Sequence, residues 1–455
     1  MGWVLRLAET GPDAAAESID LIEIHRSTGL ADIANLGLTL SEAKELLARV
    51  QQAVVAAQAR DHAVRRPSCA SCSALCHLKD WRPRRIATPF GEVAPRLRRW
   101  LCANCGQTET GIDWPENCRS TPELNELHAH LSALLTYRVA AGVLAHLLPV
   151  ETGTSPETLR GHTIKVADQL RGAAAGPCAS AAPALDLSLD ATFVRSRHEG
   201  ERHMEVRAGN VEAPGGGRQV FGSVAKSDTS ILALIGRNLE TMGRNADTKL
   251  TAFTDGCSGL RSTLVEAGVK EPPILDWYHI AMRLQHAKLS AGGLADDTPA
   301  RAVAKDFIVA QVERPHWRIW NGKAKNARVT IDRIRGVMHI FKIEAKRHGA
   351  GASSGKLWHA LHKIDEYLTG QSAWLVNYAE RHRAGLRVGT SITEGTANFL
   401  VNRRMNKQQQ MRWSRCGADA VVQVRCAIYN GTLGTGFGHL FNPESEPSQQ
   451  LAMAA

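Results

Sequence analysis

Apolar and polar residues follow a helical pattern in the first part of the chain and a strand pattern after about residue 184. Apolar positions recur at helical spacing in residues 1–65, read as an N-terminal helical region, and in residues 121–175. Between them, residues 66–120 hold a cluster of cysteines. The run 172–184 consists of small residues with Pro and Gly, which is typical of a linker.

The pattern after the linker predicts helices packed on a sheet, and therefore an α/β fold. Residues 185–193 alternate apolar and polar side chains, as a half-buried strand does. The further elements expected are strands at 202–210, 218–225, 249–254 and 273–275, with helices at 230–242 and just before the last strand. Residues 278–384 are mainly helical. Two more helices are expected, from about Thr393 and near Ala418, and the tail after Gly431 is expected to be disordered.

Composition and charge narrow the class of protein without deciding its function. The 455 residues include 44% hydrophobic residues and carry a formal net charge of +10. This balance favours a polyanionic partner, either nucleic acid or an acidic membrane surface. The chain starts without the apolar core of a signal peptide, and its most apolar stretch, 131–150, is interrupted by Arg138 and His146. We therefore expect a cytoplasmic protein that does not enter a membrane.

Two cysteine pairs predict a structural zinc site in residues 66–120. Cys69-Ala-Ser-Cys72 and Cys102-Ala-Asn-Cys105 each have the spacing with which a tight turn holds one zinc ion. Cys76 or His77 could replace a member of the first pair, and buried, reduced cysteines are the alternative. The segment between the pairs is basic, which suggests a zinc ribbon with basic hairpins; its arginines are Arg82, Arg84, Arg85, Arg96, Arg98 and Arg99.

Residues 121–175 contain a candidate helix-turn-helix. An amphipathic helix is expected from Tyr137 to Leu148, and a second from Glu157 to Leu170 after the capping sequence Ser155-Pro156. The second helix carries Arg160 and Lys165, which suit a helix that enters the major groove of DNA. Spacing alone does not separate this interpretation from an ordinary helical hairpin.

Two acidic residues stand where neighbouring strands would bring them together. Asp190 lies in the first strand of the α/β part, and Asp255 ends a later strand, directly before Gly256. Two carboxylates at close range repel each other and usually need a cation, for which oxygen ligands select Mg²⁺ or Mn²⁺. A pair of such ions can support in-line displacement at phosphorus.

Glu394 is the best candidate for a third carboxylate. It opens a predicted helix in a basic stretch, with Asn398 on the same helical face. A lone carboxylate among cations suits a metal site beside a phosphate backbone. The alternative is an acidic residue favoured by the helix dipole, and Asp186 and Glu205 are rival acids. The basic residues that flank this face are Arg403, Arg404 and Lys407.

The sequence Asp276-Trp277-Tyr278-His279 follows the last predicted strand. Asp276 and His279 could organise the active site or the DNA near it. They could equally be a helix N-cap and a packed histidine.

These motifs resemble bacterial insertion-sequence transposases of the Kra type. The resemblance rests on Leu189-Asp190-Ala191-Thr192, on Thr254-Asp255-Gly256-Cys257, on Leu275 to His279, and above all on ITEGTANFLVNRRMNKQQQMRWSRCGADAVVQVRCAIYNG. It implies a ribonuclease-H-like domain with the catalytic triad Asp190, Asp255 and Glu394. The long interval before Glu394 implies a helical insertion, as in the Mutator and hAT groups, whose Cys/Asp-x-x-His motif Asp276 and His279 match.

The resemblance also implies a domain order and a function. The catalytic domain would comprise 184–282 and 385–432, with the insertion 283–384 between them and a tail at 433–455. The zinc ribbon and the helix-turn-helix would bind DNA at the terminal inverted repeats. The protein would cut and join DNA with two Mg²⁺ or Mn²⁺ ions, acting on element ends and target DNA as a dimer or larger assembly at the nucleoid. A ribonuclease-H-like nuclease and a domesticated, non-catalytic DNA-binding regulator are the alternatives.

Overall fold

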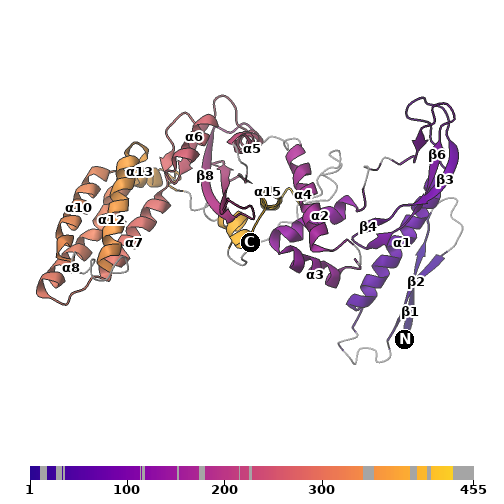
Figure 1. Ribbon diagram of the computed structural model, residues 1–455, viewed down its shortest axis with the longest axis horizontal. Coiled ribbons are helices and arrows are strands. Elements are labelled where there is room, and N and C mark those ends of the chain that lie inside the picture. The colour runs from indigo at the N-terminus through magenta and orange to yellow at the C-terminus, as the bar shows by residue number, and fades with distance from the viewer. Residues whose placement is uncertain are drawn as a thin grey trace. The chain divides into compact units, whose positions relative to one another are not determined.

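The computed structural model describes residues 1–10, 18–26, 33, 36–112, 114, 118–150, 153–173, 180–214, 216–224, 228–341, 353–389, 397–406 and 411–433. The chain divides into two compact units (Figure 1), which are Met1–Ala173 with Gln423–Ala455, and Ala174–Val422. The division after Ala173 falls within the predicted linker. The predicted tail 433–455 lies outside the described residues, apart from Leu433. No helix among the described residues is both long and apolar enough to cross a membrane.

The first unit begins with a β-hairpin, which corrects the prediction of helices throughout residues 1–65. Strands β1 (Gly2–Ala8) and β2 (Ser18–His25) pair antiparallel, and only then does helix α1 (Leu40–Val64) follow. In β2 the buried Ile22 and Ile24 alternate with exposed residues, which is the period of a strand. Helix α1 begins at a capping box formed by Thr39 and Glu42.

A small sheet follows α1 in the cysteine-rich region. Its strands are β3 (His77–Pro83), β6 (Arg96–Leu101) and β7 (Thr108–Glu109), in the order β3-β6-β7. Strands β4 (Ile86–Thr88) and β5 (Gly91–Val93) form a separate hairpin. Asp80 and Arg99 form a bidentate ion pair across β3 and β6, and Arg98 lies over the ring of Trp81. Part of the predicted basic character is therefore used within the sheet.

Three helices complete the described core of the first unit. They are α2 (Pro122–Leu134), α3 (Tyr137–Leu147) and α4 (Pro156–Gly172), and the last two confirm the helices predicted there. Each begins at a hydroxyl N-cap, namely Thr121, Thr136 and Ser155. Leu124, Leu144 and Leu159, one from each helix, are buried together.

The second unit is built on a five-stranded mixed sheet with the order β10-β9-β8-β11-β12. Strands β8, β9 and β10 pair antiparallel, whereas β11 and β12 run parallel to β8. Helices α5 and α6 lie between these strands in the chain, in the predicted order. The element bounds are β8 (Ala184–Arg195), β9 (His203–Glu212), β10 (Arg218–Ser223), α5 (Asp228–Thr241), β11 (Lys249–Thr254), α6 (Ser258–Glu266) and β12 (Ile274–Leu275).

The two faces of this sheet differ in chemistry because side chains alternate along β8. Leu185, Leu187 and Leu189 point into a core shared with α5 and α6. Asp186, Ser188 and Asp190 therefore lie on the opposite face. Helix α15 (Arg415–Tyr429) contacts β10, where a Cβ on Gly222 would lie 2.9 Å from Val422 Cγ1. The polar face of the sheet therefore carries the acidic side chains of the candidate site.

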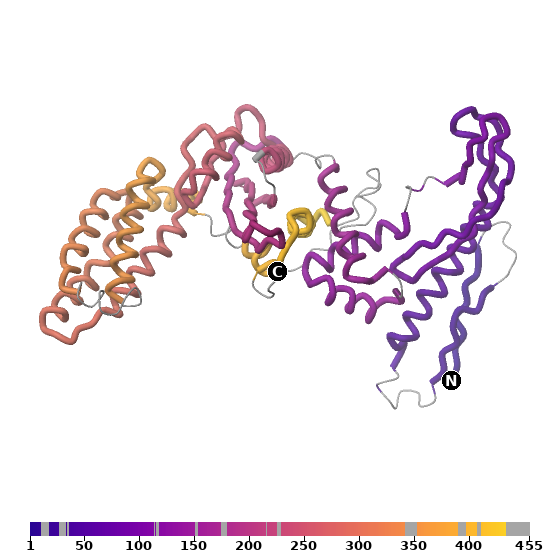
Figure 2. Tube along the Cα trace, in the orientation of Figure 1, coloured from indigo at the N-terminus to yellow at the C-terminus, as the bar shows by residue number. Residues whose placement is uncertain are grey.

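A bundle of helices follows β12, as predicted for residues 278–384, and Figure 2 shows it in orange tones. Its core is continuous with the edge of the sheet, because Phe253, Ile274 and Leu275 are buried in the same cluster as the bundle's own side chains. Its elements are α7 (Trp277–Gly292), α8 (Pro299–Val312), α9 (Arg314–Trp320), α10 (Ala324–Val337), η3 (Met338–Phe341), α12 (Ser353–Gly370), η5 (Ser372–Trp374) and α13 (Tyr378–Arg383).

Two helices from the C-terminal block return to the sheet. The π-helix η6 (Asn398–Asn406) packs on β8, and α15 packs on β10, where Asp419 accepts a hydrogen bond from the backbone N–H of Val224 at 2.8 Å. The beginning of the helix predicted near Thr393 lies outside the described residues. The sequence predicts that all of 385–432 belongs to the catalytic domain. In the structure, the part of α15 from Gln423 onward belongs to the first unit.

Candidate functional site

Asp190 and Asp255 come together through the pairing of β8 with β11. These strands run parallel, with Phe253 opposite Ser188. Asp190 lies two residues further along β8, and Asp255 directly follows the end of β11, so both lie at the same end of the paired strands. Both residues are partly buried on the polar face of the sheet. The predicted juxtaposition of the two strands is therefore confirmed.

The turn after Asp255 holds that carboxylate in place. Asp255 Oδ1 accepts a hydrogen bond from the backbone N–H of Cys257 at 2.9 Å, and the Tyr367 hydroxyl donates to the Asp255 carbonyl at 2.7 Å. Gly256 has a φ of 95°, and a Cβ there would lie 3.0 Å from Leu275 Cδ1. The sharp turn that ends β11 therefore requires glycine at position 256.

Asp276 and His279, at the beginning of α7, lie near Asp190 and Asp255. Asp276 is fully buried; its Oδ1 caps the helix by accepting from the Tyr278 N–H at 2.9 Å, and its Oδ2 lies 2.7 Å from His279 Nδ1. The hydrogen bond to Asp276 is the main cause that raises the pKa of His279, and the charges of Asp190 and Asp255 raise it further. The N-cap interpretation is therefore correct, and the same carboxylate also orients an imidazole that senses both candidate ligands.

Glu394 and Lys407 lie outside the described residues, but the chain on either side of Glu394 is anchored near the pair. Before it, the Val388 carbonyl accepts from the Trp277 N–H at 3.3 Å, and a Cβ on Gly389 would lie 2.5 Å from Asp276 Oδ1. After it, Thr192 on β8 donates to Asn402 Oδ1 at 3.4 Å.

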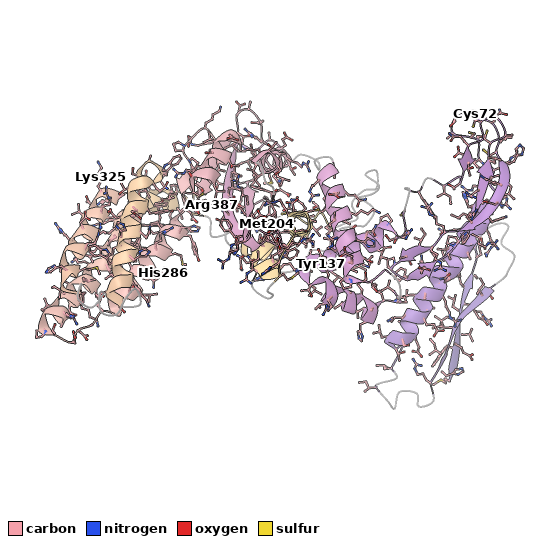
Figure 3. All side chains as sticks on the ribbon, viewed as in Figure 1. Cys72, Tyr137, Met204, His286, Lys325 and Arg387 are labelled. Atoms are coloured by element: carbon pink, nitrogen blue, oxygen red, sulfur yellow. The ribbon has the colours of Figure 1, made fainter. Side chains whose placement is uncertain are left out.

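A buried charge network under the site was not found from the sequence. Arg387 is held by Glu212 at 3.2 Å and donates to the Gly389 carbonyl at 2.9 Å, and Figure 3 places it where the sheet meets the helical bundle. Asp186 lies two positions from Ser188 on the same face of β8. Burial raises the pKa of Asp186, and the positive charge of Arg387 acts against this rise. The alternation in β8 could have placed Asp186 on this face, but nothing local indicated its cationic neighbour.

The rival acids have other surroundings. Asp186 lies in the field of the buried Arg387, and Glu205 on β9 pairs with Arg207 at 3.2 Å. Among the described residues, the only group of three or more Cys, His, Asp or Glu side chains with all ligand atoms within 4.8 Å of one another is a cysteine cluster. Asp190 and Asp255 supply two hard oxygen ligands, which fit Mg²⁺ or Mn²⁺ but need a third acid to complete a site.

The cysteine cluster consists of Cys69, Cys72, Cys102 and Cys105. The Sγ–Sγ distances are 3.4 Å for Cys69–Cys105, 3.4 Å for Cys72–Cys102 and 3.8 Å for Cys72–Cys105. A tetrahedral zinc ion with bonds of about 2.3 Å places its sulfur ligands about 3.8 Å apart. The backbone N–H of Cys105 is the first of the causes that lower the pKa of Cys102 to about 6, which favours the thiolate. Four cysteines therefore lie within metal-binding distance, compatible with structural zinc.

The two cysteine pairs have matching backbone turns. Ser73 N–H donates to the Cys69 carbonyl at 2.8 Å, and Gly106 N–H donates to the Cys102 carbonyl at 3.0 Å. Ser73 and Gly106 both have positive φ, at 59° and 71°. Cys76 is not one of the four; it is buried beside them, and burial raises the pKa of its thiol. Figure 3 shows Cys72 at the far end of the small sheet.

Helix α4, the candidate recognition helix, exposes only part of its polar surface. Lys165 is exposed, whereas Arg160 is half-buried and pairs with Glu157 at 2.6 Å. His162 stacks on His128 of α2 with ring centroids 4.9 Å apart. Burial lowers the pKa of these two histidines to about 4 and about 3, respectively, so neither is a cation at neutral pH.

The basic residues of the C-terminal block also differ in their exposure to solvent. Arg403 is exposed and Asn398 is half-buried. Arg404 is only 5% exposed, and its guanidinium lies over the ring of Trp413 at 5.2 Å. This burial favours a structural role for Arg404, because its charge is directed at the chain's own side chains.

Comparisons with known proteins add no relative. No model of a known protein family matches the chain, and a search of curated proteins finds no similar sequence. Function must therefore be argued from the motifs and from the geometry of the site.

Proposed function

We propose that the chain is a DDE-type DNA transposase of the Kra type, with a ribonuclease-H-like catalytic domain. One observation carries the proposal: β8 and β11 are neighbouring parallel strands with Phe253 opposite Ser188, so Asp190 and Asp255 follow at the same end of the pair. A carboxylate pair of this kind is costly without a cation, and it lies beside a basic chain segment that suits a polyanion. The helical bundle between β12 and η6 supports the insertion that the resemblance implies.

The proposed reaction uses the chain's residues in distinct roles. Asp190, Asp255 and Glu394 would hold two Mg²⁺ or Mn²⁺ ions, which supply an activated oxygen nucleophile and stabilise the leaving oxygen at phosphorus. Asp276 fixes the orientation of His279, which adds a polar donor at the edge of the pair. Arg403 and Lys165, both exposed, are candidates for contacts with phosphate.

The zinc-ribbon region and α2–α4 would bind the element ends. Transposition joins two ends to one target, so we expect a dimer or larger assembly. A nuclease on the same fold would cut without joining, and a domesticated regulator would bind DNA with neither activity.

A strand-transfer assay tests the proposal with Mg²⁺ and labelled duplexes that carry the inverted repeats flanking the gene. Asp190→Asn and Asp255→Asn should each bind these duplexes as the native chain does and lose cleavage by at least about 1,000-fold, since each removes a carboxylate ligand. Glu205→Gln is the matched control, because it removes a rival acid that lies on the same sheet but pairs with Arg207.

The outcomes separate the three functions. Cutting and joining that fail in both aspartate variants support the transposase. Cutting without joining by the native chain favours the nuclease, and binding without either activity favours the regulator. Full activity of Asp190→Asn would remove this residue from the active site.

A further inference from the structure

A basic pocket that is open to solvent lies at the turn of the β8–β9 hairpin, and the proposed catalytic site does not use it. The pocket has a volume of about 560 Å³. It lies where Arg195, the last residue of β8, pairs with His203, the first residue of β9. The side chains that dominate its lining are Arg195, Arg202, Arg412, His198, His203 and Glu201.

Backbone pairing brings Arg412 to this turn from a distant part of the sequence. Trp413 N–H donates to the Arg195 carbonyl at 2.9 Å, and Arg197 N–H donates to the Trp413 carbonyl at 2.9 Å. The Trp413 side chain is buried, so its packing holds the backbone of this residue against Arg195 and Arg197. The arrangement of Arg195 and Arg412 at one pocket is therefore part of the fold.

The pocket carries a positive charge that the chain does not neutralise. Glu201 is its acidic member, and its carboxylate pairs with Arg415 and accepts from the Ser196 hydroxyl at 3.1 Å. Within the described part of the chain, Arg195, Arg202 and Arg412 have no carboxylate partner. Three guanidinium groups around one pocket repel each other, and an anion would relieve that repulsion.

We infer that this pocket binds a backbone phosphate of DNA. Guanidinium groups bind phosphate oxygens in a fork, and the described lining includes no Trp, Tyr or Phe on which a base could stack. Arg195 lies five positions beyond Asp190 on β8, so the alternation of side chains places the two residues on opposite faces of the strand. The pocket is therefore a DNA contact separate from the candidate catalytic face.

This inference rests on the proposed function, because it takes DNA as the substrate. A free phosphate or a small phosphorylated molecule offers the same chemical group. The two sources differ in one respect: a DNA strand must continue out of the pocket, whereas a small molecule must fit inside it.

The test compares the double variant Arg195→Gln/Arg412→Gln with the native full-length, zinc-loaded chain in buffer without Mg²⁺ or Mn²⁺. The probe is a 30-base-pair duplex of arbitrary sequence, and its affinity is measured between 50 and 200 mM salt. Loss of two phosphate contacts should weaken binding roughly 10- to 100-fold and lower the salt slope by about 2. Arg197→Gln is the matched control, because Arg197 is exposed in the same turn but does not line the pocket.

Each outcome bears on the inference. An unchanged slope in the double variant, or an equal loss in Arg197→Gln, overturns the pocket as a phosphate site for DNA. Binding of inorganic pyrophosphate at micromolar concentration by the native chain but not by the double variant, with unchanged DNA affinity in that variant, assigns the pocket to a small ligand instead. Because binding is measured without Mg²⁺ or Mn²⁺, a native chain that binds DNA through the pocket but never cuts would refute the transposase and leave the inference standing.

Discussion

At the scale of single residues, the candidate site surrounds one imidazole, that of His279, with the charges of three carboxylates. The His279 pKa is raised first by Asp276 and then by Asp190 and Asp255, which lie on two other elements. Its ring therefore reports the charge state of the aspartate pair. The buried pair His128 and His162 has the opposite environment, in which burial lowers both pKa values.

The first prediction concerns the titration of His279. In metal-free protein, a raised pKa means that protonation of His279 stabilises the fold below its unfolded pKa of 6.5, and this stability is lost as the pH rises through the higher folded pKa. A cation bound by Asp190 and Asp255 cancels the charges that raise the pKa, so Mg²⁺ should lower it. Proton NMR of the His279 ring, assigned by its loss in His279→Gln, measures both values. If saturating Mg²⁺ leaves the pKa of His279 unchanged, metal does not bind at Asp190 and Asp255.

At the scale of elements, the sheet of the second unit was predictable because its strands obey simple rules. Period-two alternation found β8, and apolar runs that end at Asp-Gly or Asp-Trp found β11 and β12. The N-terminal hairpin was missed because most of β1 is exposed and carries little alternation in burial. The pair Arg387–Glu212 joins residues 175 positions apart, and no local pattern encodes such a contact.

The segment that follows α13 provides the second prediction. Gly389 passes so close to Asp276 that a Cβ would lie 2.5 Å from its Oδ1. Gly389→Ala should therefore displace the carboxylate that caps α7 and orients His279, and a shift of about 1 Å can cost on the order of 100-fold in rate. Cleavage assays measure the loss. Gly370→Ala is the control, because a Cβ there meets no atom within 4 Å; equal activity in the two variants would contradict a positioning role for this contact.

At the scale of the whole molecule, the two predicted metal chemistries lie in different compact units. The thiolates belong to the unit that starts at Met1, and the carboxylate pair belongs to the unit that starts at Ala174. Thiolates select zinc, and carboxylates select Mg²⁺ or Mn²⁺. The two sites should therefore be separable by mutation.

The last prediction uses that separation. The cluster of buried side chains around the four cysteines includes only one large apolar residue, Trp100, so bound zinc would supply much of the folding energy of the small sheet. In Cys72→Ser/Cys105→Ser, amides of β3 and β6 should lose protection from hydrogen exchange, while those of β8 and β9 keep it. Cys416→Ser, which changes an exposed cysteine elsewhere, should retain zinc and protection in all four strands.

Because the carboxylate pair belongs to the other unit, Mg²⁺-dependent cleavage of a nonspecific duplex should survive in the double variant even as binding to element ends is lost. Unchanged protection of β3 and β6 in a zinc-free double variant would mean that the sheet folds without metal.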